Sequence, residues 1–314
     1  MFMLQENKKI FQLAIASDWE YDLDFINFLE ESGHRHKLST YVIWRGNLED
    51  SYQQLLNGWL EIKFLFDRAS DTSHEFLKVQ KLVIANGARV LEPLESLAWA
   101  SDKATMHLEF ISNGLYTPYT IILPPYETHE NCYLSVDELA KLGRTFIIKP
   151  ANTTGGGIGV VDGAETLQDV LKARQSHHQD KYLLQEKVQP LERDGYRFWF
   201  RGFYACGLVQ CSWWNNQTHL YRELTREEIR KYKLKPLFAV VEKIAQISKL
   251  YFFSTEIALT ETGQFIVVDY VNESCDMRLQ SKALDGVPDQ IVKNSADYII
   301  RYVKKQLGNP ATRS

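Results

Sequence analysis

The sequence has little cysteine, no surplus of basic residues and no long apolar run. Its four cysteines, at 132, 206, 211 and 275, form no CxxC pair and no cluster with histidine, which argues against a disulfide framework or a structural zinc site. Lysine and arginine number 36 against 40 acidic residues, a net charge of −4. The chain therefore lacks the basic surplus typical of nucleic-acid binding. No apolar run reaches the roughly 18 residues of a membrane span.

The start of the chain lacks the pattern of a secretory signal. The apolar stretch 11–16 is short and is followed by Asp18 and Glu20, whereas a signal peptide has a longer apolar region. We therefore expect a cytoplasmic protein that binds neither nucleic acid nor membrane. The adjacent histidines His177 and His178 are assigned to a solvated loop rather than to a metal site.

The chain does contain ample material for a core. Apolar residues make up 45% of its 314 positions, and this length corresponds to about two domains. Its first segment alternates between an apolar run (10–16), helical spacing (21–32, with Gly33 as the expected stop) and a β-branched run (39–44). Alternating strands and helices predict a parallel α/β layer.

The rest of the chain is richer in strand patterns, which predicts an α+β arrangement. A helix over 77–85 and a strand over 88–91 still belong to the N-terminal layer. Beyond them, expected strands cover 119–123, 145–149, 159–162, 182–186, 196–211 (with a turn), 252–259 and 265–270; expected helices cover 103–113, 166–175, 237–250 and 288–307.

A glycine-rich loop between two of these strands is the most informative stretch: Phe146-Ile-Ile-Lys-Pro-Ala-Asn-Thr-Thr-Gly-Gly-Gly-Ile-Gly-Val160. Consecutive glycines let several backbone N–H groups point at one anion. Thr153 and Thr154 add hydroxyl donors, and Lys149 can place its ammonium beside the same phosphates. The Lys that follows the glycines in Walker A is absent, and so is the glycine spacing of the dinucleotide fingerprint. A simple hairpin turn is the alternative interpretation.

Further motifs surround the loop in a fixed order. Asp102-Lys103 opens a predicted helix that ends at Asn113-Gly114. After the loop come Leu183-Leu-Gln-Glu-Lys-Val188, then Asp194-Gly-Tyr-Arg197, and finally Glu256 on one strand with Asp269 and Asn272 on the next. From about Leu91 to Asn272 this order resembles the ATP-grasp superfamily, in particular carboxylate–amine ligases similar to D-alanine–D-alanine ligase and the ribosomal-protein glutamate ligase.

The resemblance implies a fold and a division of the chain. The fold would combine α/β and α+β parts: an N-terminal, Rossmann-like pre-ATP-grasp α/β domain (1–120) and the ATP-grasp fold proper. The latter would consist of a lid subdomain with the glycine-rich loop (121–185) and a C-terminal subdomain with the metal site (186–314).

The resemblance also implies a nucleotide site. Lys103 and Lys149 would lie at the ATP phosphates, Glu186 and the Lys187 backbone would bind the adenine edge, and Asp194, or Glu192, the ribose. Each of three residues has an alternative interpretation: Lys103 as a solvated lysine, Glu186 as an exposed carboxylate and Arg197 as a structural arginine. The full nucleotide set is Lys103, Lys149, Thr153, Thr154, Gly155, Gly156, Gly157, Gln185, Glu186, Lys187, Val188, Asp194 and Arg197.

Metal ligands implied by the family are Glu256, Asp269 and Asn272, for one or two Mg²⁺ ions that Mn²⁺ can replace. The chain departs from the family pattern here, because Asp replaces Glu and the spacing is i, i+3 instead of i, i+2. In a regular strand, residues i and i+3 point to opposite faces. Asp269 and Asn272 therefore converge only if a bulge or a strand end intervenes. Glu273 and Asp276 stay open as further ligands.

The chemistry implied is that of an ATP- and Mg²⁺-dependent ligase. Such enzymes transfer the γ-phosphoryl group to a carboxylate, and an amine or a thiol then attacks the acyl phosphate. Lys149 and Arg278 are the catalytic candidates, with Arg278 binding the substrate carboxylate and Arg222 as a second choice. The partner would be a small molecule or peptide with a carboxylate, and a homodimer is left open. An ATP-grasp kinase and a non-catalytic ATP-binding protein are the rival interpretations; the irregular metal spacing favours the latter.

Overall fold

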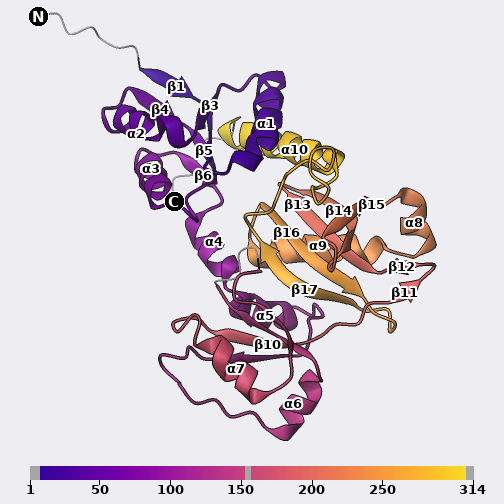
Figure 1. The fold of residues 1–314 in the computed structure, drawn as a ribbon. Coiled ribbons are helices and arrows are strands. Elements are labelled where there is room, and N and C mark those ends of the chain that lie inside the picture. The colour runs from indigo at the N-terminus through magenta and orange to yellow at the C-terminus, as the bar shows by residue number, and fades with distance from the viewer. Residues whose placement is uncertain (1–7, 153–156, 309–314) are drawn as a thin grey trace, which may run out of the picture. The chain divides into compact units, whose positions relative to one another are not determined.

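The computed structural model describes residues 8–152 and 157–308, shown in Figure 1. The chain forms two compact units. The first contains the residues up to 93, the short segment 204–208 and the residues from 274 onward. The second contains residues 94–203 and 209–273.

The first unit is built on a four-stranded parallel sheet, which confirms the predicted α/β layer. The strand order is β3-β2-β5-β6, and the central strand β2 is buried along its whole length. The strands are β2 (Leu13–Ser17), β3 (Thr40–Ile43), β5 (Phe64–Arg68) and β6 (Arg89–Leu91), beside a parallel pair of β1 (Lys9–Phe11) and β4 (Leu60–Ile62). The helical elements are η1 (Glu20–Asp22), α1 (Leu23–Arg35), η2 (Arg45–Asn47), α2 (Leu48–Leu56), α3 (His74–Ala85) and α10 (Asp289–Gly308).

Gly33 does not stop the first helix, contrary to the prediction. It lies inside α1 and is buried, and a Cβ atom at this position would come within 2.7 Å of Thr40 Cγ2 on β3. The helix ends two residues later, at Arg35. The glycine allows close packing of α1 against β3, a role that helical periodicity does not reveal.

The second unit begins with a four-stranded antiparallel sheet in the order β7-β10-β8-β9. Its apolar side packs on α6 and α7 through residues such as Leu142, Val170 and Tyr182 (Figure 1). The elements are α4 (Leu94–Ser101), α5 (Lys103–Ser112), β7 (Thr120–Leu123), α6 (Val136–Leu142), β8 (Phe146–Pro150), β9 (Val161–Ala164), α7 (Leu167–Arg174) and β10 (Tyr182–Glu186).

A five-stranded sheet in the order β15-β14-β13-β16-β17 completes the second unit. Helix α9 covers one face, since a Cβ at Gly202 would meet Val241 Cγ2 of α9 at 2.5 Å. Neighbours in a strand alternate between faces, so Arg201 points to the other side. The elements are β11 (Glu192–Arg193), β12 (Tyr196–Arg197), β13 (Trp199–Ala205), β14 (Leu208–Asn215), β15 (Leu220–Glu223), α8 (Arg226–Lys231), α9 (Lys235–Ser248), β16 (Phe252–Leu259) and β17 (Phe265–Asn272).

No helix within residues 8–152 and 157–308 has both the length and the apolar character that crossing a membrane requires.

We predict that Gly202→Ala lowers the free energy of unfolding by about 1–3 kcal/mol, because the new methyl group overpacks the contact with α9. Urea unfolding followed by circular dichroism measures the change. Gly308→Ala is the matched control, since a Cβ there meets nothing within 4 Å. Equal unfolding midpoints for the two variants would contradict the packing argument.

Candidate active site

Two lysines from different elements lie beside one short segment of β17. Lys149 of β8 is buried; its Nζ donates to the Val268 carbonyl at 3.1 Å and lies 5.2 Å from the centre of the Tyr270 ring. Lys103, in the first turn of α5, places its Nζ 4.0 Å from Asp269 Oδ1. The fold thus gathers both lysines around one short segment of β17.

The position of Lys103 is fixed by the residue before it. Asp102 is the N-cap of α5, and its side chain accepts hydrogen bonds from the N–H groups of Ala104 (2.9 Å) and Thr105 (3.1 Å). Such caps satisfy N–H groups that have no partner within the helix. The backbone N–H of Lys103 donates to Ala151 at 3.2 Å. The start of α5 is therefore held directly beside the end of β8.

Burial and charge set the protonation of this cluster. Burial, assisted by the charge of Lys103, lowers the pKa of Lys149 from 10.5 to about 8, against the opposing effect of Asp269 and Glu256. Burial acts to raise the pKa of Asp269, but the charges of Lys103, Lys149 and Arg201 outweigh it and hold that pKa below its ordinary value. Asp269 is thus ionised at neutral pH, and Lys149 is a cation close to its titration range.

The pairing of β16 with β17 contains the bulge that the metal assignment requires. Ser254 pairs with Asn272, and Glu256 pairs with Asp269, with a register shift between the two pairs. Ser254 and Glu256 are two residues apart and share a face of β16, and directly opposed residues lie on the same face of a sheet. Asp269 and Asn272 therefore lie on one face despite their i, i+3 spacing, and Glu256 lies there too.

Arg201 of β13 is a member of the site that the sequence interpretation missed. Its guanidinium donates to Glu256 Oε1, and its Nε and Nη2 donate to Ser254 Oγ at 3.2 and 3.0 Å. Glu256 Oε2 also accepts from the indole N–H of Trp199 at 3.1 Å. The available signal was a single charge at position 201, inside a run of apolar and aromatic residues (198–203).

The donor set of Glu256, Asp269 and Asn272 fits a magnesium ion. Mg²⁺ prefers hard oxygen ligands, commonly one or two carboxylates together with water and phosphate oxygens. Glu256 already accepts hydrogen bonds at each oxygen, but a carboxylate offers about four lone-pair sites, so both oxygens retain capacity. Across the described residues, no three His, Cys, Asp or Glu side chains form a metal-binding group. The amide oxygen of Asn272 is therefore needed to complete the proposed set.

Gln185 ties β10 to β17 rather than pointing into solvent. Its side-chain amide donates to Tyr270 Oη at 2.7 Å and to Thr120 Oγ1 at 3.0 Å. Tyr270 Oη also lies 2.5 Å from His107 Nδ1. Burial, assisted by the charge of Lys149, lowers the pKa of His107 to about 4. His107 is therefore neutral at neutral pH. The buried hydrogen bonds among Gln185, Tyr270 and His107 connect β10 with β17 and α5.

The predicted adenine residues lie at the end of β10. Glu186 accepts from the Tyr119 N–H at 2.8 Å, the exposed Lys187 pairs with Asp162 at 2.8 Å, and Val188 follows the strand. Their role toward adenine stays a prediction.

The predicted ribose and phosphate residues beyond this strand have protein partners. Asp194 is exposed and pairs with Lys231 at 2.8 Å, while Arg197 lies 3.5 Å from Glu192. Gly157 has a positive φ of 80°, which suits glycine. The residues Thr153, Thr154, Gly155 and Gly156 lie outside the described part of the chain.

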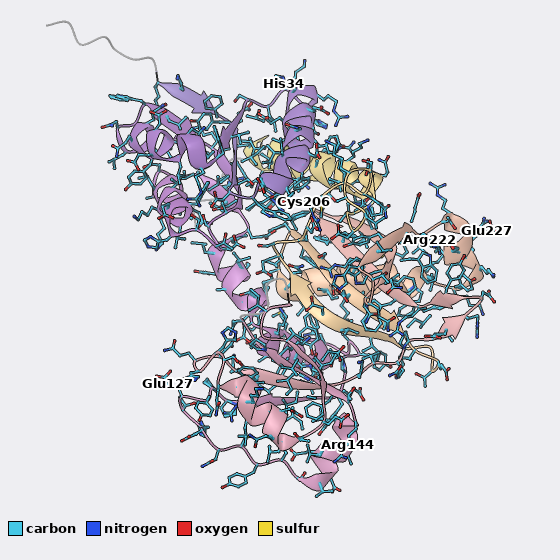
Figure 2. All side chains as sticks on the ribbon, viewed as in Figure 1. His34, Glu127, Arg144, Cys206, Arg222 and Glu227 are labelled. Carbon is cyan, nitrogen blue, oxygen red and sulfur yellow. The ribbon has the colours of Figure 1, made fainter. Side chains whose placement is uncertain are left out.

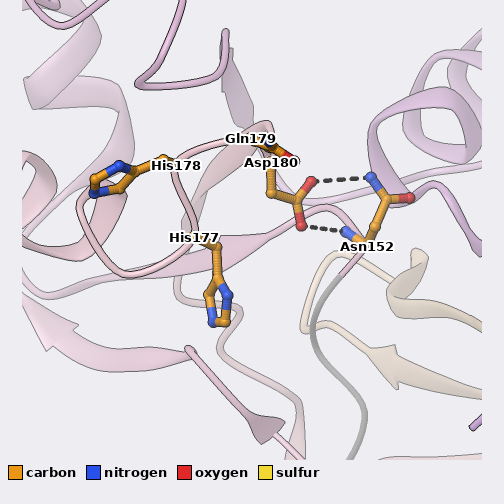
Figure 3. Close-up of a pocket in the computed structure, with 5 residues that line it drawn as sticks. All are labelled: Asn152, His177, His178, Gln179 and Asp180. Atoms are coloured by element: carbon orange, nitrogen blue, oxygen red, sulfur yellow. Dashed lines mark hydrogen bonds between the residues drawn. The ribbon is translucent and has the colours of Figure 1, made fainter.

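A cavity of about 450 Å³ adjoins the base of the glycine-rich segment, lined by Asn152 and the loop 177–180. Figure 3 shows Asp180 accepting from the backbone N–H (2.8 Å) and the side-chain amide (2.9 Å) of Asn152. His177 borders the other end of the segment, since a Cβ at Gly159 would come within 3.1 Å of its ring. The loop 177–180 therefore lies next to both Asn152 and Gly159.

The two arginines proposed for the substrate carboxylate are held by acidic side chains. In the first unit, Arg278 donates to Asp276 at 2.8 and 2.6 Å and to Asp285 at 3.2 and 2.9 Å. In the second, Arg222 donates to Glu228 at 2.7 Å. Figure 2 labels Arg222 on β15. These contacts are sufficient to explain both arginines as structural residues, and their role toward a substrate stays a prediction.

Neither a family model nor a curated protein matches the chain. Solved structures do match along nearly its whole length. D-alanine–D-alanine ligase from Bacillus anthracis, complexed with ATP, superposes with a TM-score of 0.65 at 15% identity, covering 95% of this chain and 99% of the other. The chain has the ATP-grasp fold. A RimK domain ATP-grasp protein from Sphaerobacter thermophilus gives 0.62 at 16% identity over 92% and 98%. The ATP-grasp ligase PsnB, complexed with minimal precursor, Mg and ADP, gives 0.58 at 15% over 93% and 98%.

We predict a pH dependence of stability that originates at Lys149. Its pKa is lower in the folded chain than in the unfolded one, so the unfolded state binds more protons between these two values and the free energy of unfolding rises with pH there. Relative to a Lys149→Met variant, the rise amounts to about 2 kcal/mol between about pH 7 and pH 9.5. Urea titrations across this range measure it. Parallel pH profiles for the two proteins would contradict the assignment.

Proposed function

We propose that this ATP-grasp chain is an ATP- and Mg²⁺-dependent ligase that activates a substrate carboxylate as an acyl phosphate and joins it to an amine. The observation that carries the proposal is the convergence of Lys103 and Lys149 on the segment of β17 around Asp269, which shares a face with the oxygen donors Glu256 and Asn272. Two ammonium groups and a set of hard oxygen donors match what a nucleoside triphosphate with its divalent ion requires.

In this proposal the residues have separate tasks. Lys103 and Lys149 bind the phosphate oxygens, while Glu256, Asp269 and Asn272 would hold Mg²⁺, which when bound neutralises phosphate charge. A carboxylate oxygen of the substrate attacks the γ-phosphorus and ADP leaves. The amine nitrogen then attacks the acyl carbon, inorganic phosphate leaves and the amine loses a proton. No protein nucleophile is required, because catalysis rests on positioning and charge stabilisation.

The bulged pairing of β17 favours catalysis over ATP binding without turnover. The i, i+3 spacing of Asp269 and Asn272 was the main argument for a degenerate metal site. That argument no longer applies, because the bulge places both residues on one face of the sheet. Two of the structurally similar proteins supply independent support. One is a D-alanine–D-alanine ligase complexed with ATP, and the other is the ATP-grasp ligase PsnB complexed with Mg and ADP.

We predict that Lys149→Ala weakens ATP binding by about ten- to a hundredfold, the effect of losing one charge-assisted hydrogen bond. Calorimetry in the presence of Mg²⁺ measures the change. Lys172→Ala is the control, because Lys172 is exposed on α7. This variant should bind ATP as tightly as the wild type does. A folded wild-type protein without ATP affinity would refute the proposed function.

We predict that Asp269→Asn reduces the Mg²⁺ enhancement of ATP binding by at least about tenfold, because one anionic metal ligand is lost. Calorimetry with and without Mg²⁺ gives the ratio of affinities. Asp137→Asn, at an exposed position of α6, leaves the ratio unchanged. An enhancement that survives Asp269→Asn would remove β17 from the metal site.

A further inference from the structure

A continuous set of side chains links the metal-site candidates to an aromatic surface on the same face of the five-stranded sheet. Asp269 pairs with Glu256 across β17 and β16, and Glu256 accepts from Trp199 of β13. Arg201, which donates to Glu256, also places its guanidinium carbon 5.7 Å from the centre of the Trp214 ring on β14. Trp214 therefore lies on the face of Asp269 and Glu256, opposite α9.

The aromatic surface continues onto β15. Trp214 pairs with Tyr221, and their ring centres are 4.4 Å apart. His219, in the turn between the two strands, stacks on Trp214 with ring centres 5.5 Å apart and an angle of 12°. Trp214 and Tyr221 are half-buried and His219 is exposed. We call Trp214, His219 and Tyr221 the aromatic platform.

This platform differs from the core packing next to it. The neighbouring Trp213 is only 5% exposed, and its ring packs on Phe198, Phe200 and Tyr232, on the α9 side of the sheet. Two buried polar atoms lie at or next to the platform: within the described residues, neither Trp214 Nε1 nor Oδ1 of the nearby Asn216 has a hydrogen-bond partner. A donor and an acceptor thus lack a partner at the edge of an apolar surface, and a bound ligand that reaches them would satisfy both.

The other end of this surface, around Asp269 and Glu256, has an excess of positive charge. The cations Lys103, Lys149 and Arg201 outnumber the carboxylates Glu256 and Asp269, so this end attracts an anion. In the proposed function, that anion is the substrate carboxylate together with the ATP phosphates. A substrate whose carboxylate lies next to the Arg201 guanidinium has the Trp214 ring beside it, since the guanidinium carbon is 5.7 Å from the ring centre.

We propose that the carboxylate substrate carries an aromatic ring that packs on the aromatic platform. This inference rests on the proposed function and specifies its substrate class as aromatic carboxylic acids. Aromatic pairs are more favourable than the burial of their apolar area alone explains. A saturated ring of the same size buries a similar area but lacks the π-system, which provides a matched pair of probes.

The test measures binding of 3-phenylpropanoate and 3-cyclohexylpropanoate to the full chain in the presence of Mg²⁺ and a non-hydrolysable ATP analogue. Calorimetry should show the phenyl acid binding about two- to tenfold more tightly than the cyclohexyl acid. Trp214→Leu should abolish this preference, and Tyr221→Leu, as a second variant, should reduce it. Trp44→Leu, at a 58% exposed tryptophan of the first unit, should retain it.

The possible failures are distinguishable. Equal affinities for the two acids, a preference that survives Trp214→Leu, or binding of neither acid while the ATP analogue binds would overturn the substrate class and leave the proposed function standing. Failure of the folded chain to bind the ATP analogue would overturn both. Loss of analogue binding in Trp214→Leu would indicate misfolding, and Tyr221→Leu then decides.

Discussion

The pairing of β16 with β17 is the constraint on which the rest of the site depends. β17 contains one more residue than β16 between Asn272 and Asp269 and another between Asp269 and Val267, so Asp269 lies between two bulges. The Thr255 hydroxyl donates to the Asp269 carbonyl at 2.8 Å and supports the backbone there. Bulges commonly redirect side chains next to active sites. Here they place one carboxylate opposite Glu256 and within reach of Lys103.

The charges around Asp269 come from parts of the chain that are distant in sequence. Lys103 begins a helix, Lys149 lies in one sheet, and Arg201 and Glu256 lie in neighbouring strands of another. Each is partly or fully buried, and a buried charge without a partner is costly. The ion pairs therefore depend on one another, because removal of one charged member leaves its partner buried without a counter-charge.

Local patterns predicted much of the fold. Strand β16 has the predicted bounds, 252–259, and β10 the predicted 182–186, because both begin with aromatic and aliphatic residues that favour strands. Helix α2 was not predicted, since it is short and is fixed by packing at Leu48 and Leu55. Gly33 was wrongly predicted to end the first helix, because glycine is favoured both at helix ends and where two elements pack closely. Motif order singled out Lys103, Lys149 and β17 as candidates, and the structure brings them together. It did not point to Arg201, whose partner Glu256 lies 55 residues away. Only the three-dimensional strand pairing shows the bulge that places Asn272 on the same face as Asp269.

The indole of Trp199 has a consequence for observing this protein. Its N–H donates to Glu256, so its fluorescence depends on the charge and solvation of a residue that would coordinate the metal. The six other tryptophans, at 19, 44, 59, 99, 213 and 214, contribute background, of which Trp213 and Trp214 share its sheet. A variant that keeps Trp199 alone would report occupancy of the site by its own emission, without a label and before any substrate is identified.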